Sequence, residues 1–453
     1  MVSRYVQPGG KHMNSNVYWQ ASSLRVDHGV NVEILTWPLN DLWTESLPEN
    51  KNGCSVPPLL VHAGGLVYHV INPPIEWNGR PSSESEWEEA VTFGMHVLDA
   101  ICPDIVHLQH WGGLWWILES AQRLGIPTVY TNHDWGIACL QTTLVMGDDS
   151  LCDGKLSVKK CSKCIWQGRS FIGKVNEFMA VTAIGRGVID ALYLTPLKRV
   201  LEGRGAVRLP LRGRVELNLG RAKRILGNLE AMFTPSEFGR IFFSQLGVPL
   251  DRIQIKPWYH DPNKTQKNIT SPQYFTITYI GRVSPEKGVH LIFEALDRIK
   301  LTVQIELRIA GSNSSPYCMD LRKKYPTEVG GHKVEWLGWS EIEPLFMTTD
   351  VCIIPSTWID NTPLSLVEAL SYQVPVIATK VPTIEELVSE GENGYLAEYN
   401  SIDSLGKAIQ RAVADVDYIR SGFMKFPRIS TRREYTSIVK KTYLSISESS
   451  LTE

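Results

Sequence analysis

Short apolar segments of strand length alternate with stretches of helix length along most of this chain. The first series of predicted strands covers residues 31–37, 67–71, 104–109, 126–131, 231–235 and 253–257. Helical stretches separate them, including residues 84–100 and 114–124. This alternation predicts a parallel, doubly wound sheet of the Rossmann type, which binds ligands at the carboxyl ends of its strands.

A second series of apolar segments follows a polar stretch. Residues 260–273 (HDPNKTQKNITSPQ) read as an interdomain linker, after which strands are predicted at 275–281, 303–310, 333–337, 351–355 and 375–379. We therefore predict an α/β protein of two facing Rossmann-like domains with a ligand cleft between them. The domains cover residues 1–259, with an insertion at about 138–225, and residues 274–428. A helix within the final segment, 429–453, can cross back to the first domain.

Length and composition agree with this organisation. A chain of 453 residues is too long for one hydrophobic core and suggests two or three domains. Hydrophobic residues make up 43% and charged residues 21% of the chain, as in ordinary soluble proteins. No apolar run reaches the roughly 18 residues that would span a bilayer, and residues 1–6 read as a strand rather than a signal peptide. We expect a cytoplasmic protein.

Residues 356–368 (STWIDNTPLSLVE) carry the most specific chemistry in the second domain. They follow an apolar strand and are predicted to open a helix whose first turn holds Thr362, Pro363 and Ser365. The unpaired N–H groups of a helix start form a seat for an anion such as a diphosphate. Asp360 and Glu368 frame this seat, and acids there suit the hydroxyls of a ribose or sugar. The alternative is an ordinary capped helix with both acids facing water.

The loop after the first strand of that domain adds positive charge. It reads GRVSPEKG, with Arg282 at the strand end and Lys287 at a helix start. A rigid guanidinium and a flexible ammonium above one site could neutralise a diphosphate leaving group without a metal ion. An isolated Arg and Lys on a loop are more often surface charges. Together with the segment around Thr362, they favour a nucleotide-sugar site.

The charge of the insertion is strongly unbalanced, although the whole chain has a net charge of only −2. Residues 155–224 contain sixteen Lys or Arg and four acids. Apolar residues recur at helical spacing between 171 and 194, which would suit peripheral contact with an anionic membrane, at its inner face for a cytoplasmic protein. The alternative is a helical subdomain with a solvated basic face. Nucleic acid is the least expected partner because no recognition module accompanies the charge.

Four of the eight cysteines crowd one segment of the insertion: Cys139, Cys152, Cys161 and Cys164. The last two form a CxxC pair, and four thiolates can close a tetrahedral zinc site. The spacing of the first two is not that of a standard zinc ribbon or knuckle, so ordinary reduced cysteines are the alternative to a structural zinc.

These motifs resemble glycosyltransferase family 4, which contains retaining enzymes of the GT-B fold. The resemblance is carried by GRVSPEKG and PSTWIDNTPLSLVEALSYQVPVIAT in the second domain, and by DIVHLQHW, IPTVYTNHD and MFTPSEFGR in the first. It extends over nearly the whole chain. It implies a nucleoside-diphosphate sugar as donor, a hydroxyl acceptor and no cofactor required for catalysis.

The resemblance also implies roles for individual residues. Arg282 and Lys287 match the basic pair that holds the donor diphosphate and stabilises it as it leaves. Glu368 matches the carboxylate that binds the ribose, and Asp360 stands where the family has an acid, usually Glu, that contacts the sugar hydroxyls. His133 matches a histidine that faces the transferred sugar.

Other residues complete the two halves of the implied site. On the donor side these are Gly281, Gly338, Asn361, Thr362, Pro363 and Leu364, with Trp336 and Trp339 either shaping the base pocket or packing in the core. On the acceptor side they are Gly9, Gly10 and Asp134. One further departure is Pro382-Thr383, where the family often has Gly-Gly, because a proline cannot offer an N–H.

Three classes of function follow. The leading one is a retaining glycosyltransferase without a covalent enzyme intermediate, in which a diphosphate oxygen takes the proton of the acceptor. The second is a sugar-nucleotide epimerase or a phosphorylase on the same fold. The third is a non-catalytic membrane-binding or zinc-binding scaffold.

Overall fold

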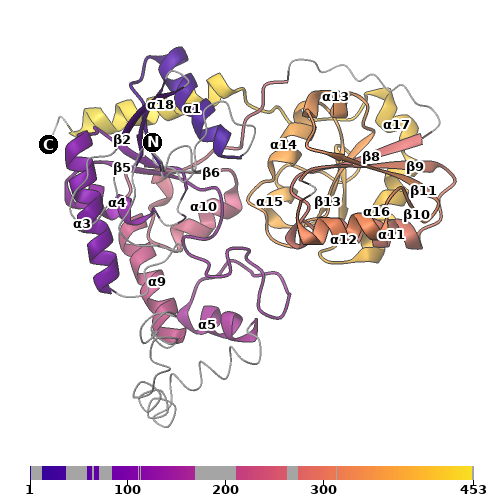
Figure 1. Ribbon diagram of the computed structural model, residues 1–453, viewed down its shortest axis with the longest axis horizontal. Coiled ribbons are helices and arrows are strands. Elements are labelled where there is room, and N and C mark those ends of the chain that lie inside the picture. Colours follow the sequence, from indigo (N-terminus) through magenta and orange to yellow (C-terminus); the bar gives the residue numbers. More distant parts are fainter. Residues whose placement is uncertain are drawn as a thin grey trace, which may run out of the picture. The chain divides into compact units, whose positions relative to one another are not determined.

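The structure is a computed structural model that describes residues 1, 13–36, 59–63, 66–70, 84–110, 112, 114–168, 211–262, 274–312 and 314–450. Contacts divide the chain into two compact units. Unit 1 comprises Met1–Thr234, Arg240–Gln254 and Thr436–Glu453, and unit 2 comprises Pro235–Gly239 and Ile255–Tyr435. Figure 1 shows that each unit consists of a sheet with helices packed around it.

The described part of unit 2 contains a seven-stranded sheet with the order β10-β11-β9-β8-β12-β13-β14. Its strands are β8 (Tyr274–Ile280), β9 (Gln304–Ala310), β10 (Glu328–Val329), β11 (His332–Gly338), β12 (Val351–Ile354), β13 (Val376–Thr379) and β14 (Gly394–Ala397). The short strand β10 runs antiparallel to β11, and the other neighbouring pairs are parallel. The five predicted strands of this domain are present, whereas the sequence analysis missed β10, which has only two residues, and also β14.

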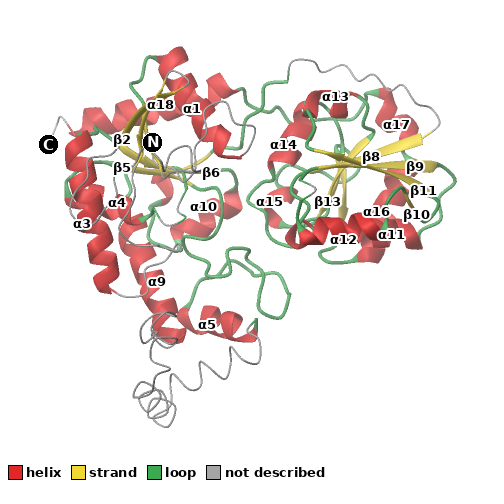
Figure 2. Ribbon diagram, in the orientation of Figure 1, coloured by secondary structure: helices red, strands yellow, loops and turns green. Residues whose placement is uncertain are grey.

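Helices lie on both sides of this sheet (Figure 2), as a doubly wound fold requires. They are η2 (Pro285–Lys287), α11 (Val289–Arg298), α12 (Pro316–Lys324), α13 (Ile342–Met347), α14 (Leu364–Ser371), α15 (Pro382–Glu385), α16 (Ile402–Ala414) and α17 (Val416–Ser421). The central strands are buried on both faces, which explains their continuous apolar sequences. Arg420 ties the end of α17 to the sheet, with its guanidinium 2.8 Å from Asp350.

The described part of unit 1 contains two groups of strands. A parallel group has the order β4 (Val106–Leu108), β5 (Thr128–Thr131), β6 (Ala231–Thr234) and β7 (Ile253–Ile255). A second group has the order β1 (Glu33–Thr36), β3 (Leu66–Val70) and β2 (Leu59–Ala63). The strand β2 was not predicted, and it pairs antiparallel with β3, so the sheet of this unit is not purely parallel. The chain returns within two residues between them, too short for a helical crossover.

The helices of unit 1 include the C-terminal helix. They are α1 (Met13–His28), α3 (Glu84–Ile101), α4 (Trp116–Arg123), α5 (Val158–Gln167), α9 (Leu211–Leu226), η1 (Leu250–Arg252), α10 (Glu237–Ser244) and α18 (Arg432–Ser450). Most of α18 belongs to unit 1: Tyr443 contacts His107 of β4 at 2.5 Å, and Lys440 donates to the carbonyl oxygen of His28 at 2.8 Å. Among the described helices none is both long and apolar enough to cross a membrane.

Candidate active site

The loops after β8 and β12 lie against each other in unit 2. Gly288 has a φ of 67°, and a Cβ there would lie 1.9 Å from the carbonyl oxygen of Pro355. Only glycine permits this approach. The N–H of Thr357 also donates to the carbonyl oxygen of Glu286 at 2.9 Å. This contact fixes the predicted basic loop next to the predicted anion seat, two segments about 70 residues apart in sequence.

The contact brings Lys287 and Asp360 together as a hydrogen-bonded ion pair. Their side chains are only 19% and 11% exposed. The Lys287 ammonium also lies 5.1 Å from the ring centre of Trp358, which provides a cation–π contact. Without a ligand, therefore, the lysine expected to hold the diphosphate is neutralised by the acid expected to hold the sugar.

Arg282 is in a different situation from Lys287. Its side chain is 70% exposed, and its guanidinium lies 3.5 Å from the carboxylate of Glu286. Such an exposed pair is weak and leaves the guanidinium free to turn toward another anion. Gly281, which precedes it, has a φ of 147°, a conformation that L side chains rarely adopt, at the carboxyl end of β8.

The helix of the anion seat starts later than predicted. We expected Thr362 and Pro363 in its first turn, but α14 begins at Leu364 and Pro363 precedes it in an extended conformation. Thr362 has a φ of 55°, which lies in the left-handed region and is incompatible with a right-handed helix. The first N–H groups of α14, beginning at Leu364, still lack acceptors within the helix. Asn361, just before them, accepts a hydrogen bond on its carbonyl oxygen from Trp258 Nε1 at 3.3 Å.

Buried polar groups without partners surround this helix start. Within the described residues, the hydroxyls of Ser284, Ser356 and Thr362 and the indole N–H of Trp358 are buried and form no hydrogen bond. Buried polar groups are normally paired, because an unmade hydrogen bond costs about 1–3 kcal/mol. These four groups come from both loops. Their position indicates that the surface is completed by a polar ligand.

Glu368 lies on the second turn of α14. Burial raises the pKa of its carboxyl group from 4.5 to about 7. No hydrogen bond to this carboxylate is present among the described residues, so it is available to accept from hydroxyl groups. A carboxylate with a pKa near neutrality in an otherwise apolar helix is typical of a functional site.

The two tryptophans near Gly338 differ in burial: one packs on the core and the other is exposed. The carbonyl oxygen of Gly338, at the end of β11, accepts from the N–H of Gly311 at 2.7 Å. The ring of Trp336 stacks on Phe293 with ring centres 5.6 Å apart, so this side chain packs on the core. Trp339 is 51% exposed beside Gly338. Of the two tryptophans, Trp336 packs on the core and Trp339 is exposed.

The predicted acceptor-side histidine lies just beyond the carboxyl end of β5 in unit 1. His133 Nε2 is 3.0 Å from Gln109 Oε1, and its ring stacks on His110 at 4.8 Å. Burial, followed by the neighbouring histidines, holds the pKa of His133 well below its usual value, so the ring is neutral at physiological pH. Asp134 accepts from the N–H of Gly136 at 2.7 Å and thereby stabilises the turn after His133. Gly9 and Gly10 lie outside the described residues.

The predicted zinc site is not formed. Within the described residues, which include Cys139, Cys152, Cys161 and Cys164, no group of three or more His, Cys, Asp or Glu is arranged to hold a metal ion. Burial raises the pKa of Cys139, Cys161 and Cys164, which keeps these thiols protonated. Cys152 contacts the Lys160 ammonium at 3.4 Å instead. The CxxC spacing places Cys161 and Cys164 on α5, a regular helix, rather than on the tight turn of a zinc knuckle.

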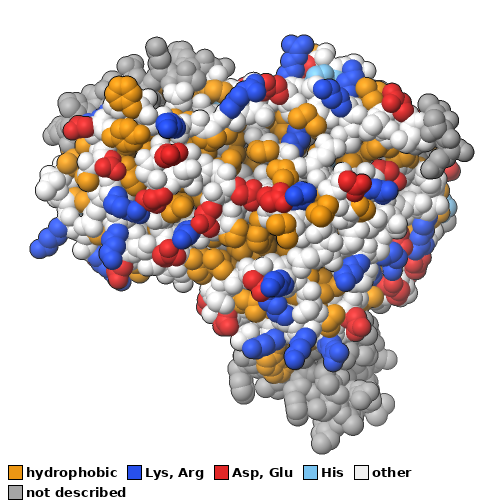
Figure 3. All heavy atoms as spheres, turned by 180° about the vertical axis from the view of Figure 1, so that it is seen from behind, with side chains coloured by type: hydrophobic (Ala, Val, Ile, Leu, Met, Phe, Trp, Pro, Cys, Tyr) orange, Lys and Arg blue, Asp and Glu red, His pale blue; other side chains and the backbone are white. Residues whose placement is uncertain are grey.

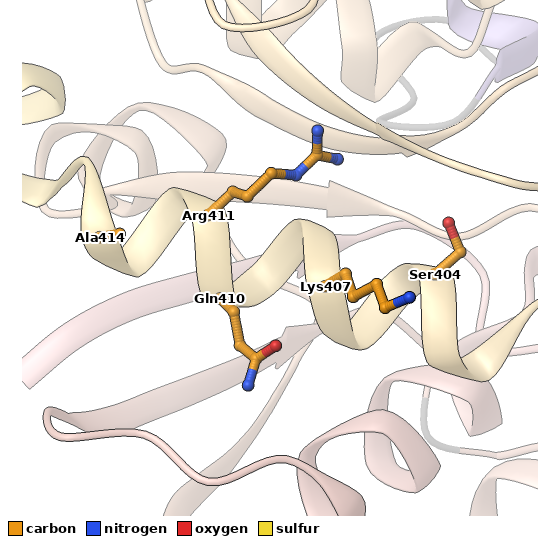
Figure 4. Close-up of a pocket in the computed structure, with 5 residues that line it drawn as sticks. All are labelled: Ser404, Lys407, Gln410, Arg411 and Ala414. Carbon is orange, nitrogen blue, oxygen red and sulfur yellow. The ribbon is translucent and has the colours of Figure 1, made fainter.

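A shallow cavity of about 520 Å³ lies elsewhere on unit 2. Figure 4 shows its lining side chains along α16: Ser404, Lys407, Gln410, Arg411 and Ala414. Arg411 is already engaged by Glu390 at 2.5 Å. None of these residues belongs to the loops after β8 and β12, so this cavity is separate from the candidate site.

Sequence reasoning missed residues that support the site. Trp358 was passed over, although it stands two residues before Asp360. The Thr383 hydroxyl donates to the carbonyl oxygen of Asp360 at 2.6 Å, so the Pro382-Thr383 departure places a stabilising side chain behind the acid. Trp258 contacts the Asn361 carbonyl oxygen and Gln109 contacts His133, and both contacts join residues distant in sequence. A single sequence gives no signal for such contacts.

Comparison with known proteins finds similarity to glycosyltransferases. Residues 261–420, which include both loops and α14, match the family model described as "Glycosyl transferases group 1". Lipopolysaccharide 1,2-N-acetylglucosaminetransferase of Salmonella typhimurium is 27% identical over 211 residues, 41% of this chain and 53% of that protein. The putative colanic acid biosynthesis glycosyltransferase WcaL of the same organism is 26% identical over 247 residues, 51% of this chain and 53% of that protein. The matches span about half the length of these relatives.

Solved structures agree over the whole chain. Sucrose-phosphate synthase from Thermosynechococcus elongatus superposes with a TM-score of 0.57 at 16% identity, covering 100% of this chain and 97% of that one. Anabaena HepE, solved in complex with UDP and glucose, gives a TM-score of 0.56 at 15% identity, covering 100% and 98%. The fold is GT-B. The predicted fold class is thus confirmed, and the named relatives support the predicted enzyme class, a glycosyltransferase.

Proposed function

We propose that this protein is a retaining glycosyltransferase of family 4 that transfers a sugar from a nucleoside-diphosphate sugar to an acceptor hydroxyl. The observation that carries the proposal is the site at the start of α14. Lys287, Asp360 and four unpartnered polar groups meet there, within the segment that matches the group 1 glycosyltransferase model. Structures of the same fold, including Anabaena HepE, are known with UDP and with UDP-glucose.

In the proposed donor complex the diphosphate lies over the first N–H groups of α14 and Arg282 turns toward it. The diphosphate competes for the Lys287 ammonium, and Asp360 is then free to accept hydrogen bonds from sugar hydroxyls. The carboxylate of Glu368 receives the ribose hydroxyls, and Trp339 contacts the base beside Gly338. The diphosphate would replace Asp360 as the partner of Lys287, and the ribose hydroxyls would supply the hydrogen bonds that the Glu368 carboxylate lacks among the described residues.

The proposed reaction needs no nucleophile from the protein. The bond between the anomeric carbon and the diphosphate oxygen breaks, and the acceptor oxygen forms its bond to that carbon on the same face. The proton of the acceptor hydroxyl passes to the departing diphosphate oxygen. Arg282, Lys287 and the α14 N–H groups stabilise the negative charge that develops there, which is the main contribution such a site can make. For His133 we propose the role that the resemblance implies, facing the transferred sugar.

The test is transfer from nucleoside-diphosphate sugars by the wild type and the variants Arg282→Ala and Lys287→Ala. We expect each variant to lose about 10²–10³ in kcat/KM, as removal of a preorganised charge-stabilising group does elsewhere. Lys407→Ala, on α16, is the matched control and is expected to behave as the wild type. Thermal-shift screening against nucleoside diphosphates identifies the donor base beforehand, because binding raises the melting temperature. Unchanged transfer by both loop variants would contradict the proposed site.

The same experiment separates the alternative functions. An epimerase would convert the labelled sugar nucleotide without an acceptor, and a phosphorylase would require inorganic phosphate as acceptor. A non-catalytic scaffold would bind nucleotide without turnover. Product analysis with labelled donor decides among these classes.

A second proposal is that the basic insertion mediates peripheral contact with the anionic inner face of a membrane. Much of residues 155–224, including 171–200, lies outside the described part. The described part includes α5 and α9, which pack on each other. The side chains of Lys159, Lys163 and Arg212 on these helices are exposed, and Trp166 on α5 is 39% exposed. Figure 3 shows Lys and Arg side chains gathered on the lower part of unit 1, where Figure 1 labels α5 and α9. Failure of anionic vesicles to retain the protein at low salt would contradict this proposal.

A further inference from the structure

Two oppositely charged side chains of the candidate site compensate each other. The Lys287 ammonium and the Asp360 carboxylate form a hydrogen-bonded ion pair, and their side chains are only 19% and 11% exposed. Within the described residues the Asp360 carboxylate has no other hydrogen bond, and the only other group near the ammonium is the ring of Trp358, at 5.1 Å. A ligand that binds either charge must therefore compete with the other.

The acid of this pair is held more firmly than the lysine. The Asp360 carbonyl oxygen accepts from the Thr383 hydroxyl at 2.6 Å and from the Thr362 N–H at 3.0 Å. The Asp360 N–H donates to the carbonyl oxygen of Trp358 at 3.0 Å, and the whole residue is 7% exposed. An aspartate side chain is short, so the carboxylate stays buried unless this backbone moves. Lysine has a long flexible stem, so its ammonium is the partner that can turn to an anion.

Moving the ammonium away leaves a buried negative charge without compensation. Removing one partner of a buried ion pair is strongly unfavourable, because the remaining charge has neither water nor a counter-charge. The unfavourable free energy is reduced only if the ligand donates hydrogen bonds to the carboxylate in return. How well a ligand binds here thus depends on the groups that it presents to Asp360.

The substrate and the product of sugar transfer differ in such groups. Phosphate oxygens accept hydrogen bonds, and in the proposed donor complex the ribose hydroxyls bind Glu368. A nucleoside diphosphate therefore takes the ammonium of Lys287 and gives nothing to Asp360. A sugar attached to the same diphosphate carries hydroxyl groups, which donate to a carboxylate.

We propose that the Lys287–Asp360 ion pair makes Asp360 a specificity-determining residue, which favours binding of the intact sugar donor over binding of the nucleoside diphosphate product. Both ligands take the ammonium, but only the donor returns hydrogen bonds to the carboxylate. After transfer these hydrogen bonds are lost, and re-formation of the ion pair favours release of the diphosphate. This inference rests on the proposed function for the positions of the diphosphate and the sugar.

Calorimetry of the full-length protein measures this preference. The probes are UDP, ADP and GDP and the glucose conjugate of each, and the base that binds the wild type most tightly is used throughout. The measured quantity is the dissociation constant of the diphosphate divided by that of its glucose conjugate. Asp360→Asn keeps the shape of the side chain and removes its charge. We expect this variant to bind the diphosphate about 10-fold more tightly and the ratio to fall at least as much, since a hydrogen bond to a charged group contributes about that factor.

A double-mutant cycle separates competition for the lysine from simple repulsion between the acid and the phosphates. In a Lys287→Met background there is no ammonium to compete for. Adding Asp360→Asn there should change the affinity for the diphosphate by no more than about 3-fold, the effect of a partly screened charge. Arg282 and the N–H groups of α14 still hold the diphosphate, so its affinity is measured at raised ligand concentration.

The matched control is Glu306→Gln. Glu306 lies on β9 of the same unit, and its side chain is 8% exposed. Its carboxylate is also held by a lysine, Lys333, at 2.6 Å, and by Arg308, and neither of these partners belongs to the loops after β8 and β12. This variant should leave the ratio of dissociation constants unchanged.

The outcomes separate this inference from the proposed function. An unchanged ratio in Asp360→Asn overturns the inference, and so does a gain in diphosphate affinity that is as large without Lys287 as with it. An equal change in Glu306→Gln would show a general charge effect and would also overturn it. If the wild type transfers sugar while the ratio is unchanged in Asp360→Asn, only the inference fails. If no sugar is transferred but the ratio falls as expected, the proposed function fails and the discrimination by Asp360 stands. Binding of none of the probes refutes both.

Discussion

The carboxyl group of Glu368 is expected to make the protein less stable as the pH rises. Its pKa is about 7 in the folded protein because burial disfavours the charged form, against 4.5 as its ordinary value. Between these two pH values the folded state binds more protons than the unfolded state. The free energy of unfolding therefore falls as the pH rises through this window, and the loss is complete above pH 7.

The size of the effect follows from the shift. Each pKa unit corresponds to 1.36 kcal/mol, so a rise from 4.5 to about 7 amounts to about 3 kcal/mol. The variant Glu368→Gln has no charge to bury. We expect it to be more stable than the wild type by about 3 kcal/mol at pH 8.5 and by about 1 kcal/mol at pH 5.

Urea unfolding of both proteins at pH 5 and 8.5 measures this difference, in the transition that belongs to unit 2. Glu385→Gln, which removes an exposed acid from the same unit, is the control and should change stability little at either pH. Calorimetry adds a functional readout. If ribose hydroxyls bind the carboxylate and lower its pKa, nucleotide binding at pH 7 should release up to about half a proton in the wild type, in excess of Glu368→Gln. A stability difference that is the same at both pH values would refute the reasoning.

Three further predictions concern the two loops. Gly288→Ala should destabilise the protein by more than 2 kcal/mol in urea unfolding, because the new Cβ would meet the Pro355 carbonyl oxygen. The control is Gly391→Ala, which should cost only about 1 kcal/mol, because Gly391 also has a positive φ of 75° but has open space around it. Asp360→Asn should lower sugar transfer about 100-fold. Nucleoside diphosphate should bind at least as tightly in calorimetry, because Lys287 is released from its ion pair with Asp360. A parallel loss of nucleotide affinity would contradict this prediction. Thr383→Val should lower transfer several-fold with little change in nucleotide affinity, because it removes the hydrogen bond behind Asp360.

The sequence alone predicted most of the architecture. Parallel strands such as β8 and β12 are buried on both faces and are therefore continuous apolar runs, which a single sequence reveals. The strands β2, β10 and β14 escaped detection. The strand β10 has only two residues, too few to carry a pattern, and β2 pairs antiparallel within a series expected to be parallel. The residue types of Arg282, Lys287, Asp360 and Glu368 were likewise apparent from their motifs.

Only the tertiary structure decided how these residues interact. The Lys287–Asp360 pair, the raised pKa of Glu368 and the contact between His107 and Tyr443 all depend on packing between segments distant in sequence. The four cysteines show the same limit, because their spacing suggested zinc, while the described residues contain no group of three or more His, Cys, Asp or Glu arranged to hold a metal ion. Local sequence determines which strands and loops form. Burial and the partners of each charged group, which decide its chemistry, are set by long-range contacts.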